Sequence, residues 1–176
     1  MDQQADKQIM NTRNLPVTSA LRFLREHNVS FVPHPYTYEE HGGTALAAAE
    51  LGIDEHSVIK TLVFQTNAGK PLLVLMHGDR EVSTKQLARF LGVKGVTACD
   101  PATAQRHTGY MVGGISPFGT RSPLPVYVES TVFNLPKIYI NGGKRGLLVE
   151  IQPQEAERTL MLERVAVGIV ESRDVR

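Results

Sequence analysis

The stretch 110-YMVGGISPFG-119 decides how the rest of the chain has to be arranged. Three glycines and a proline lie among a few apolar residues, so the stretch is a loop and not a core element. Gly113 and Gly114 carry no Cβ and permit positive φ, which lets backbone N–H groups converge on an oxygen of a bound group. Pro117 restricts Ser116 to extended conformations and stiffens the far side. The sequence therefore predicts a loop that brings backbone close to a ligand.

A second glycine-rich stretch, 141-NGGKRG-146, follows the same logic and adds two cations. Lys144 and Arg145 follow two glycines and can present charge and backbone N–H groups to a phosphate. A solvated loop explains the same residues equally well, and the pattern alone leaves both interpretations open. Two such loops in one small domain predict one shared site.

Length and composition indicate a single globular domain. The chain has 176 residues, of which 41% are hydrophobic and 21% are charged, and its net charge is +1. We expect a flexible tail over residues 1–14 and one domain over 15–176. The net charge argues against a protein coated in nucleic acid, although a local basic patch can exist within a neutral total.

The chain carries no sign of an oxidising compartment or a membrane. Cys99 is the single cysteine and cannot form an internal disulfide. No apolar run approaches the roughly 18 residues of a membrane span, and the N-terminal stretch lacks a signal-peptide core. The expected location is the cytoplasm, without a membrane partner.

Capping residues, glycines and apolar periodicity predict the order of helices and strands. Helices are expected from Thr18 to His27, from Thr44 to Gly52, from Ser83 to Gly92 with Leu87, Phe90 and Leu91 inward, from Asp100 to Gly109, and from Pro153 with Leu160, Met161 and Val165 inward. Strands are expected at 31–36 on an edge, at 58–65 and 71–77 as a hairpin, and at 93–98, 126–129, 137–140, 147–151 and 166–170. This order predicts an α/β fold: a single domain with a curved, barrel-like mixed β-sheet surrounded by helices.

The familiar catalytic motifs are absent. The run Gly114 to Gly119 resembles a nucleophile elbow, but its first glycine is misplaced and Pro117 stands where a helix should begin, so Ser116 is a poor nucleophile. The pair Gly143 and Lys144 lacks the other residues of a P-loop. Six histidines without metal spacing and one cysteine predict neither a metal nor a cofactor.

Lys60 lies in an unusual position for a lysine. In the run 58-VIKTLVF-64, the strand period places it on the face of Val58 and Leu62, among apolar side chains. Its ammonium can reach water from the end of the strand, or it can stand at the rim of a pocket and bind a phosphate or a developing negative charge. The two interpretations differ in solvent access.

Three stretches together resemble the YbaK/EbsC family, whose members are free-standing relatives of the editing domain inserted in bacterial prolyl-tRNA synthetase. They are 60-KTL-62, 99-CDPATAQRHTGYMVGGISPFG-119 and 138-IYINGGKRG-146, and the similarity runs in order from about residue 18 to about 170. The resemblance implies a barrel-like mixed sheet and hydrolysis of mischarged aminoacyl-tRNA, above all Cys-tRNA(Pro). Relatives act on Ala-tRNA(Pro) or on other small amino acids, and prolyl-tRNA synthetase is the partner that the family implies.

The resemblance also implies roles for particular residues. Lys60 would engage the 3′-terminal adenosine and its phosphate, and the loop from Gly113 to Pro117 would contact the aminoacyl carbonyl. The family's tyrosine aligns best with Tyr36, while Tyr38 stays open. The predicted catalytic residues are Lys60, Gly113 and Gly114, and the predicted substrate-binding residues are Tyr36, Thr61, Ile115, Ser116, Pro117, Asn141, Gly142, Gly143, Lys144 and Arg145.

Such a site needs no protein nucleophile, because an aminoacyl ester is already activated and has only to be positioned and polarised. The substrate's own thiol can attack in a cysteinyl ester, whereas water must attack an alanyl ester. Asn141 and Leu148 replace a serine and an aspartate usual in the YbaK branch, which leaves the preferred amino acid open. A non-catalytic RNA- or nucleotide-binding module is the alternative, and Lys85 and Arg89 are weaker candidates for contact with the acceptor stem.

Overall fold

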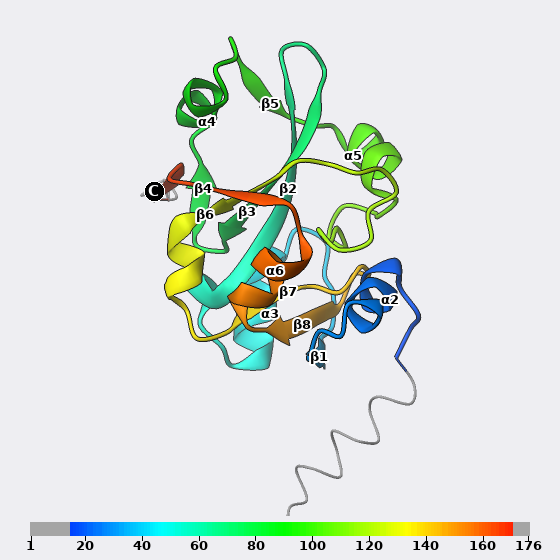
Figure 1. The fold of residues 1–176 in the computed structure, drawn as a ribbon. Coiled ribbons are helices and arrows are strands. Elements are labelled where there is room, and N and C mark those ends of the chain that lie inside the picture. The colour runs from blue at the N-terminus through cyan, green and yellow to red at the C-terminus, as the bar shows by residue number, and fades with distance from the viewer. Residues whose placement is uncertain (1–14, 171–176) are drawn as a thin grey trace, which may run out of the picture.

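The structure is a computed structural model in which residues 15–170 are described. The predicted tail 1–14 and the last six residues of the predicted domain lie outside this range. Figure 1 shows helices at both ends of a large sheet, with α4 and α5 at one end and α2, α3 and α6 at the other. The helices are α2 Ser19–Glu26, α3 Gly43–Leu51, α4 Thr84–Leu91, α5 Pro101–Thr108 and α6 Pro153–Thr159, with 3-10 helices η1 Glu55–Ser57 and η2 Ser130–Asn134.

Most helix boundaries follow the capping residues of the sequence. Thr18, Ser83 and Asp100 each accept a backbone N–H from the first turn of α2, α4 and α5. Three glycines in the left-handed conformation end α3, α4 and α5, namely Gly52, Gly92 and Gly109. The predicted starts of α2, α4 and α5 and the ends of these three helices are confirmed.

The strands form one large mixed sheet and one small one. They are β1 Val32–Pro35, β2 Val58–Thr66, β3 Pro71–His77, β4 Arg80–Val82, β5 Val96–Ala98, β6 Val126–Glu129, β7 Ile138–Asn141, β8 Leu147–Ile151, β9 Leu162–Val165 and β10 Gly168–Val170. The large sheet has the order β1-β8-β7-β2-β3-β6-β9, with β5 also on β2, and β10 pairs with β4 apart from it.

The sheet mixes parallel and antiparallel neighbours. The hairpin of β2 and β3 is antiparallel as predicted, whereas β2 and β7, β3 and β6, and β6 and β9 run parallel. The proline-containing β1 lies on an edge, also as predicted. Within residues 15–170, β1 and β9 are not paired with each other, so the sheet stays open. The predicted α/β single domain with a mixed sheet is confirmed.

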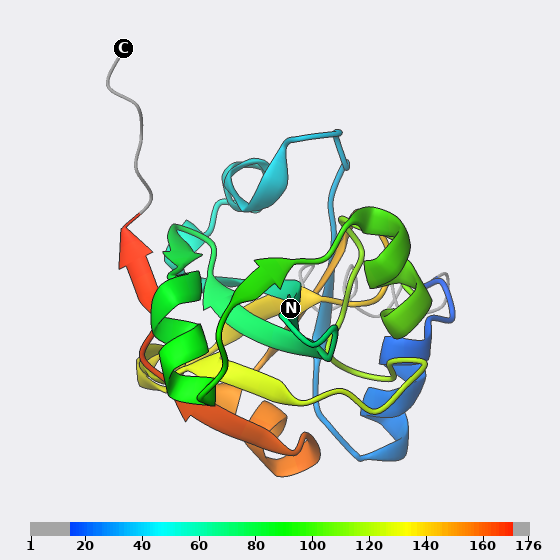
Figure 2. The same cartoon turned by 90° about the horizontal axis from the view of Figure 1, so that it is seen from above.

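Both faces of β2 are covered. Ile59 and Val63 face the main core, which α2 and the loop of residues 110–119 also enter. The other face carries Val58 under α3 and Phe64 under α4. Lys60 comes between these two, on the face that both helices cover, and Figure 2 shows α3 and α4 over neighbouring parts of the sheet.

Three side chains differ from the sequence prediction. The N-cap of α3 is Gly42, not Thr44, whose hydroxyl instead donates to Glu55 and Gly78. Phe90 is 47% exposed, and Ala88 takes the inward position. Met161 is 96% exposed because α6 ends at Thr159.

The C-terminal part also folds differently. The residues after α6 form β9, whose Val165 is buried, because they find a parallel partner in β6. The predicted last strand is shortened to β10 and belongs to the small sheet. The strand predicted at 93–98 is shorter as well and begins at Val96.

Candidate active site

Lys60 stands beside the end of β7, where the second glycine-rich loop begins. Because Ile59 pairs with Ile140 in the parallel register, the next residues along, Lys60 and Asn141, are neighbours on strands about 4.8 Å apart. Side chains at matching positions leave the same face, so both emerge together. The Lys60 ammonium donates to the carbonyl of Arg80, which comes directly after the tight turn that follows β3.

The Lys60 ammonium has N–H donors that its hydrogen bond to Arg80 does not use. It is partly exposed and makes no ion pair within residues 15–170. An ammonium has three N–H donors, and the Arg80 carbonyl uses one. Of the two interpretations drawn from the sequence, the geometry fits an anchored ammonium that can still bind an anion.

Asn141 joins the two glycine-rich loops. Its Nδ2 donates to the carbonyl of Gly113 at 3.0 Å, and its Oδ1 accepts the N–H groups of Gly143 at 2.8 Å and Lys144 at 3.2 Å. A single side chain therefore fixes the start of one loop against the middle of the other. The two loops therefore lie in contact, and their role as one functional site stays a prediction.

The glycines of both loops allow contacts that no other residue would permit. A Cβ on Gly114 would lie 2.8 Å from the backbone nitrogen of Arg145, and one on Gly143 would lie 2.9 Å from the Tyr110 ring. Gly113 has φ of +91°, and its Cβ would lie 2.9 Å from the Tyr38 ring. Real Cβ atoms do not approach other heavy atoms so closely, so these glycines are required by packing as well as by conformation.

Tyr38 and Arg145 close the outer side of the site. The Arg145 guanidinium lies over the Tyr38 ring with its carbon 4.9 Å from the ring centre, and its Nε donates to the Val112 carbonyl at 2.8 Å. Three segments meet here: the chain before α3, the loop after α5 and the loop after β7. Figure 1 shows the same convergence near α2.

The backbone amides of the first loop divide into used and free groups. The Gly114 N–H donates to the Met111 carbonyl at 2.9 Å and closes a turn. Within residues 15–170, no hydrogen bond uses the N–H groups of Gly113, Ile115 and Ser116. Of the three, only Gly113 belongs to an exposed residue, so its N–H group is the one that an anionic oxygen can reach.

Ser116 is not placed to attack a substrate. It is fully buried, and its hydroxyl accepts the Phe118 N–H at 3.3 Å. Ile115 and Pro117 are buried too, so Gly113 is the part of the loop from Gly113 to Pro117 that is exposed. The Tyr110 hydroxyl donates to the Phe118 carbonyl below the loop, and burial raises the pKa of Tyr110 to about 12.

Other predicted residues lie near the site in different environments. Tyr36 packs in the small cluster under α3, and its N–H donates to the Gly146 carbonyl; burial is the main reason that its pKa is raised. Thr61 faces away from Lys60, and its buried hydroxyl has no partner within the described residues. Leu148 pairs with Asn141 and is buried with Ala47. Substrate contact by Tyr36 and Thr61 stays a prediction.

A histidine pair supports the turn that binds Lys60. The rings of His56 and His77 stack with centres 3.7 Å apart, and His56 donates to Asp79 at 2.7 Å. His77 is buried; its Nδ1 donates to the His56 carbonyl, so its Nε2 accepts from the Thr131 hydroxyl. Burial lowers the pKa of His77, which is therefore held neutral.

Three contacts at the site escape the sequence analysis. They are the Arg80 carbonyl, the Tyr38 ring and the Thr18 hydroxyl, which donates to the Gly142 carbonyl at 2.6 Å. Tyr38 had a weak signal, because the resemblance left it open as the alternative to Tyr36. The other two depend on tertiary contacts that no local pattern encodes.

Two further properties bear on function. Within residues 15–170, no group of three or more histidine, cysteine, aspartate or glutamate residues could hold a metal ion. No helix among the same residues is long and apolar enough to cross a membrane.

Comparison with known proteins identifies the class of this site. The model of the family described as "Aminoacyl-tRNA editing domain" matches residues 39–159, which include Lys60 and both glycine-rich loops. The fold and the site therefore define an aminoacyl-tRNA deacylase, a hydrolase that acts on an ester bond.

Individual relatives indicate the branch of the family to which the chain belongs. A protein of Enterococcus faecalis named "Putative Cys-tRNA(Pro)/Cys-tRNA(Cys) deacylase EbsC" is 30% identical over 138 residues, which cover 78% of this chain and 84% of that protein. Proline–tRNA ligase of Syntrophotalea carbinolica is 36% identical over 70 residues, 40% of this chain and 12% of that protein. This chain belongs to the aminoacyl-tRNA editing family, in its YbaK/EbsC branch.

A solved structure shares the fold. The crystal structure of "a putative trans-editing enzyme for prolyl tRNA synthetase" matches with a TM-score of 0.76 and 22% identity, over 88% of this chain and 99% of that one. At this identity the likeness concerns the fold alone.

Proposed function

We propose that this chain hydrolyses mischarged aminoacyl-tRNA in trans, with Cys-tRNA(Pro) as its substrate. The observation that carries the proposal is that Asn141 ties the two glycine-rich loops together one position beyond the Ile59–Ile140 pair, next to Lys60 on β2. Lys60 supplies an anchored cation, and Gly113, which Asn141 holds through its carbonyl, supplies a free N–H group. The name of the Enterococcus relative supports cysteine as the amino acid.

Lys60 binds the 3′-terminal adenosine through its phosphate. Its ammonium keeps two N–H donors beyond the one given to Arg80, and it makes no ion pair among the described residues that a phosphate would have to displace. Lys144 and Arg145 add charge at the mouth of the site. Lys60 thus fixes the end of the tRNA while the loop acts on the ester.

The loop from Gly113 to Pro117 holds the ester carbonyl. The free N–H group of the exposed Gly113 stabilises the oxyanion that forms when the carbonyl is attacked. Gly114 permits the turn and the close approach of Arg145 instead of donating itself. Losing one such donor typically costs about 100-fold or more in turnover.

The attacking group comes from the substrate or from water. In a cysteinyl ester the thiol sulfur attacks the carbonyl carbon, its proton passes to the departing ribose oxygen, and the ester C–O bond breaks to release a thiolactone. In an alanyl ester water attacks and the free amino acid is released. The fully buried Ser116 does not compete with either.

Hydrolysis of Ala-tRNA(Pro) is the second candidate. Leu148 favours it, because a buried leucine beside Asn141 makes that side of the site apolar where a carboxylate would stand in the YbaK branch. We further propose that the protein acts in the cytoplasm, where charged tRNA is used, and that prolyl-tRNA synthetase is its partner. The partial match to proline–tRNA ligase supports that relation.

The experiment is deacylation of Cys-tRNA(Pro), Ala-tRNA(Pro), Ser-tRNA and Pro-tRNA(Pro) by the purified chain, with the released product identified. Turnover of Cys-tRNA(Pro) well above the other three supports the first candidate, and preference for Ala-tRNA(Pro) supports the second. Absence of turnover on all four, with tRNA still bound, would contradict both and favour a non-catalytic binding module.

A further inference from the structure

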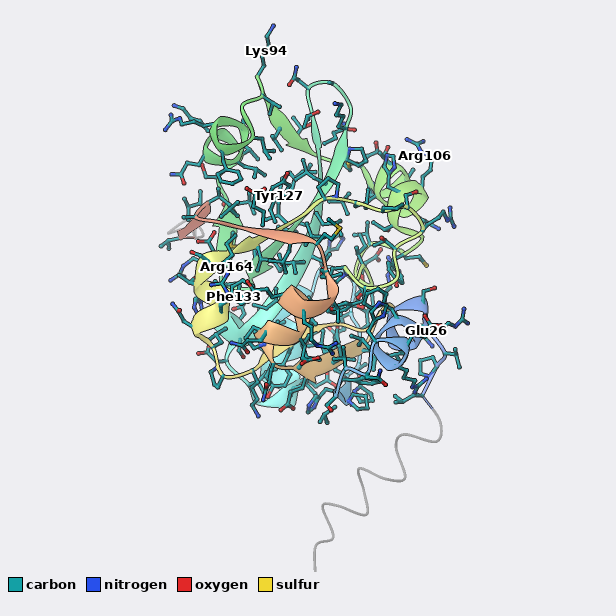
Figure 3. All side chains as sticks on the ribbon, in the orientation of Figure 1. Glu26, Lys94, Arg106, Tyr127, Phe133 and Arg164 are labelled. Carbon is teal, nitrogen blue, oxygen red and sulfur yellow. The ribbon has the colours of Figure 1, made fainter. Side chains whose placement is uncertain are left out.

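A shallow basic groove lies on the same face of the sheet as Lys60 but at the other end of β2. It has a volume of about 380 Å³ and is lined by residues of α4 and of the segment that leads into β5, namely Thr84, Lys85, Ala88, Arg89, Val93, Lys94, Gly95 and Val96. Figure 3 shows Lys94 projecting from this end of the molecule. The groove shares no residue with the loops at the active site.

Three cations line this groove without acidic partners. Lys85 and Arg89 lie one turn apart on α4, and Lys94 follows the end of the helix; all three are exposed. None makes an ion pair with another residue of the described part of the chain. By contrast, the exposed Arg158 and Arg164 pair with acids of α6. The cations of the groove are therefore available to a negatively charged ligand.

The distance from Lys60 suits a long substrate. Thr66, six residues after Lys60 on β2, pairs with Val96 in the groove. A strand rises about 3.3 Å per residue, so the groove begins roughly 20 Å along β2 from Lys60. A single nucleoside cannot span that distance, whereas a chain of several nucleotides can.

We propose that this groove binds the phosphate backbone of the tRNA acceptor arm while Lys60 binds its terminus. The inference rests on the proposed function, because it takes Lys60 as the position of the 3′ end. Three unpaired cations along a groove match a row of phosphates, and such contacts position a nucleic acid without reading its sequence. The apolar residues Ala88 and Val96 are buried in the groove floor, so it lacks the exposed aromatic anchor that a protein partner would use.

The test compares Lys85→Gln/Arg89→Gln with the matched control Arg22→Gln/Arg25→Gln, whose two exposed arginines lie one turn apart on α2. Binding of uncharged tRNA is measured against salt concentration for both and for the wild type. We expect the groove variant to lose on the order of 10-fold in affinity and about 1.5 to 2 in the slope of log affinity against log salt. The control should stay within 2-fold of the wild type.

Substrate length gives an independent readout. With Cys-tRNA(Pro), the groove variant should raise KM about 10-fold and leave kcat unchanged. With 3′-O-cysteinyl-adenosine 5′-monophosphate, which keeps the phosphate proposed for Lys60 but cannot reach the groove, it should match the wild type. Equal loss on both substrates would overturn the proposal, because the groove would then act through the active site or through stability.

Failure of this inference is distinct from failure of the proposed function. If the groove variant binds tRNA as tightly as the wild type, the groove is not a tRNA site, whatever the deacylation result. If the wild type deacylates nothing but the groove substitutions still weaken salt-dependent tRNA binding, the groove is supported as a tRNA site. The assignment as a deacylase is then contradicted. If neither the wild type nor the groove variant binds tRNA, the proposal that the groove is a tRNA site is overturned.

Discussion

The two ends of strand β2 are built in opposite ways. Near its start, β2 lies beside β7, which leads into the second glycine-rich loop, and Gly113, Gly114 and Gly143 of the two loops leave less than 3.0 Å for a Cβ. At its other end, a Cβ on Gly69 or Gly92 would meet nothing within 4 Å. The first end is closely packed and holds the proposed chemistry, whereas the second end is open and carries the basic groove.

This difference shows what glycine contributes in each place. At the open end, Gly69 and Gly92 supply only a positive φ, at a turn and at a helix end. At the closed end the missing Cβ lets two loops touch. Glycine substitutions at the closed end should therefore affect activity, and glycine substitutions at the open end only stability.

Among substitutions in the two glycine-rich loops, the largest effect is expected from Gly114→Ala. Its Cβ would push the Arg145 backbone away and separate the two loops, and a displacement of about 1 Å can cost 100-fold in rate. Deacylation should fall about 100-fold. The matched Gly69→Ala should keep full activity and lose about 1 kcal/mol of unfolding free energy, measured by urea denaturation. Equal activity of the two variants would contradict the proposed difference between the two ends of β2.

Asn141→Asp should have the next largest effect. The carboxylate can still accept the N–H groups of Gly143 and Lys144, but it cannot donate to the Gly113 carbonyl and instead repels it. We expect about a 10-fold loss of deacylation with little change in melting temperature. Asn141→Ala removes all three hydrogen bonds and should also lower the unfolding free energy, by about 2 kcal/mol. An Asn141→Asp variant with wild-type turnover would show that this donation does not position the loop.

The closed end should also respond to pH. The pKa of His77 is lowered in the fold by burial. Below about pH 6.5, His77 is therefore protonated in the unfolded chain more readily than in the folded chain. The unfolding free energy should be undiminished above pH 6.5 and fall below it, with a slope of up to about 1.4 kcal/mol per pH unit from this group.

Variants at two histidines isolate this contribution. His77→Gln can still donate to the His56 carbonyl and should flatten the slope between pH 6.5 and 5, as denaturation at several pH values would reveal. The exposed His41→Gln serves as the control and should leave the slope unchanged. An unchanged slope in His77→Gln would assign the pH dependence to other groups.

The smallest effect is expected from Tyr110→Phe. The variant keeps the ring under Gly143 but removes the hydroxyl that donates to the Phe118 carbonyl, which should cost about 1 kcal/mol of unfolding free energy. Because the loop conformation depends mainly on Asn141 and the glycines, activity should change less than 3-fold. A larger loss of activity would place Tyr110 among the residues that set the loop geometry.

Local signals in the sequence predicted most of the elements. Thr18, Ser83 and Asp100 mark helix starts because their side chains satisfy free N–H groups nearby in the chain. Thr44 failed as a start, because its hydroxyl finds tertiary partners in Glu55 and Gly78. Capping is predictable only where no more distant partner competes for the same side chain.

Periodicity failed where a short apolar run fits either a helix or a strand. The residues from Leu160 to Val165 have helical spacing, yet they leave α6 and pair with β6, which supplies a row of backbone partners that the sequence cannot reveal. Phe90 has helical spacing too, but it ends up half exposed beside the Tyr127 ring. In both cases tertiary packing overrides the local pattern.

The sequence predicted which loops contribute to the site, but not how they are arranged in space. Two glycine-rich stretches with Lys60 pointed to one site, because their composition excludes a core role. The bridge through Asn141, the ring of Tyr38 and the carbonyl of Arg80 come from segments far apart in the sequence. Single-sequence patterns hold no information on such contacts.

The most direct measurement is single-turnover deacylation of Cys-tRNA(Pro) by the wild type, Lys60→Ala and Lys70→Ala, with tRNA binding measured in parallel. Lys70 is an exposed lysine in the turn after the same strand and serves as the control. The account predicts rapid deacylation by the wild type and Lys70→Ala, and a loss of at least 100-fold in Lys60→Ala. Deacylation by Lys60→Ala at the wild-type rate would contradict the claim that this lysine holds the substrate for hydrolysis.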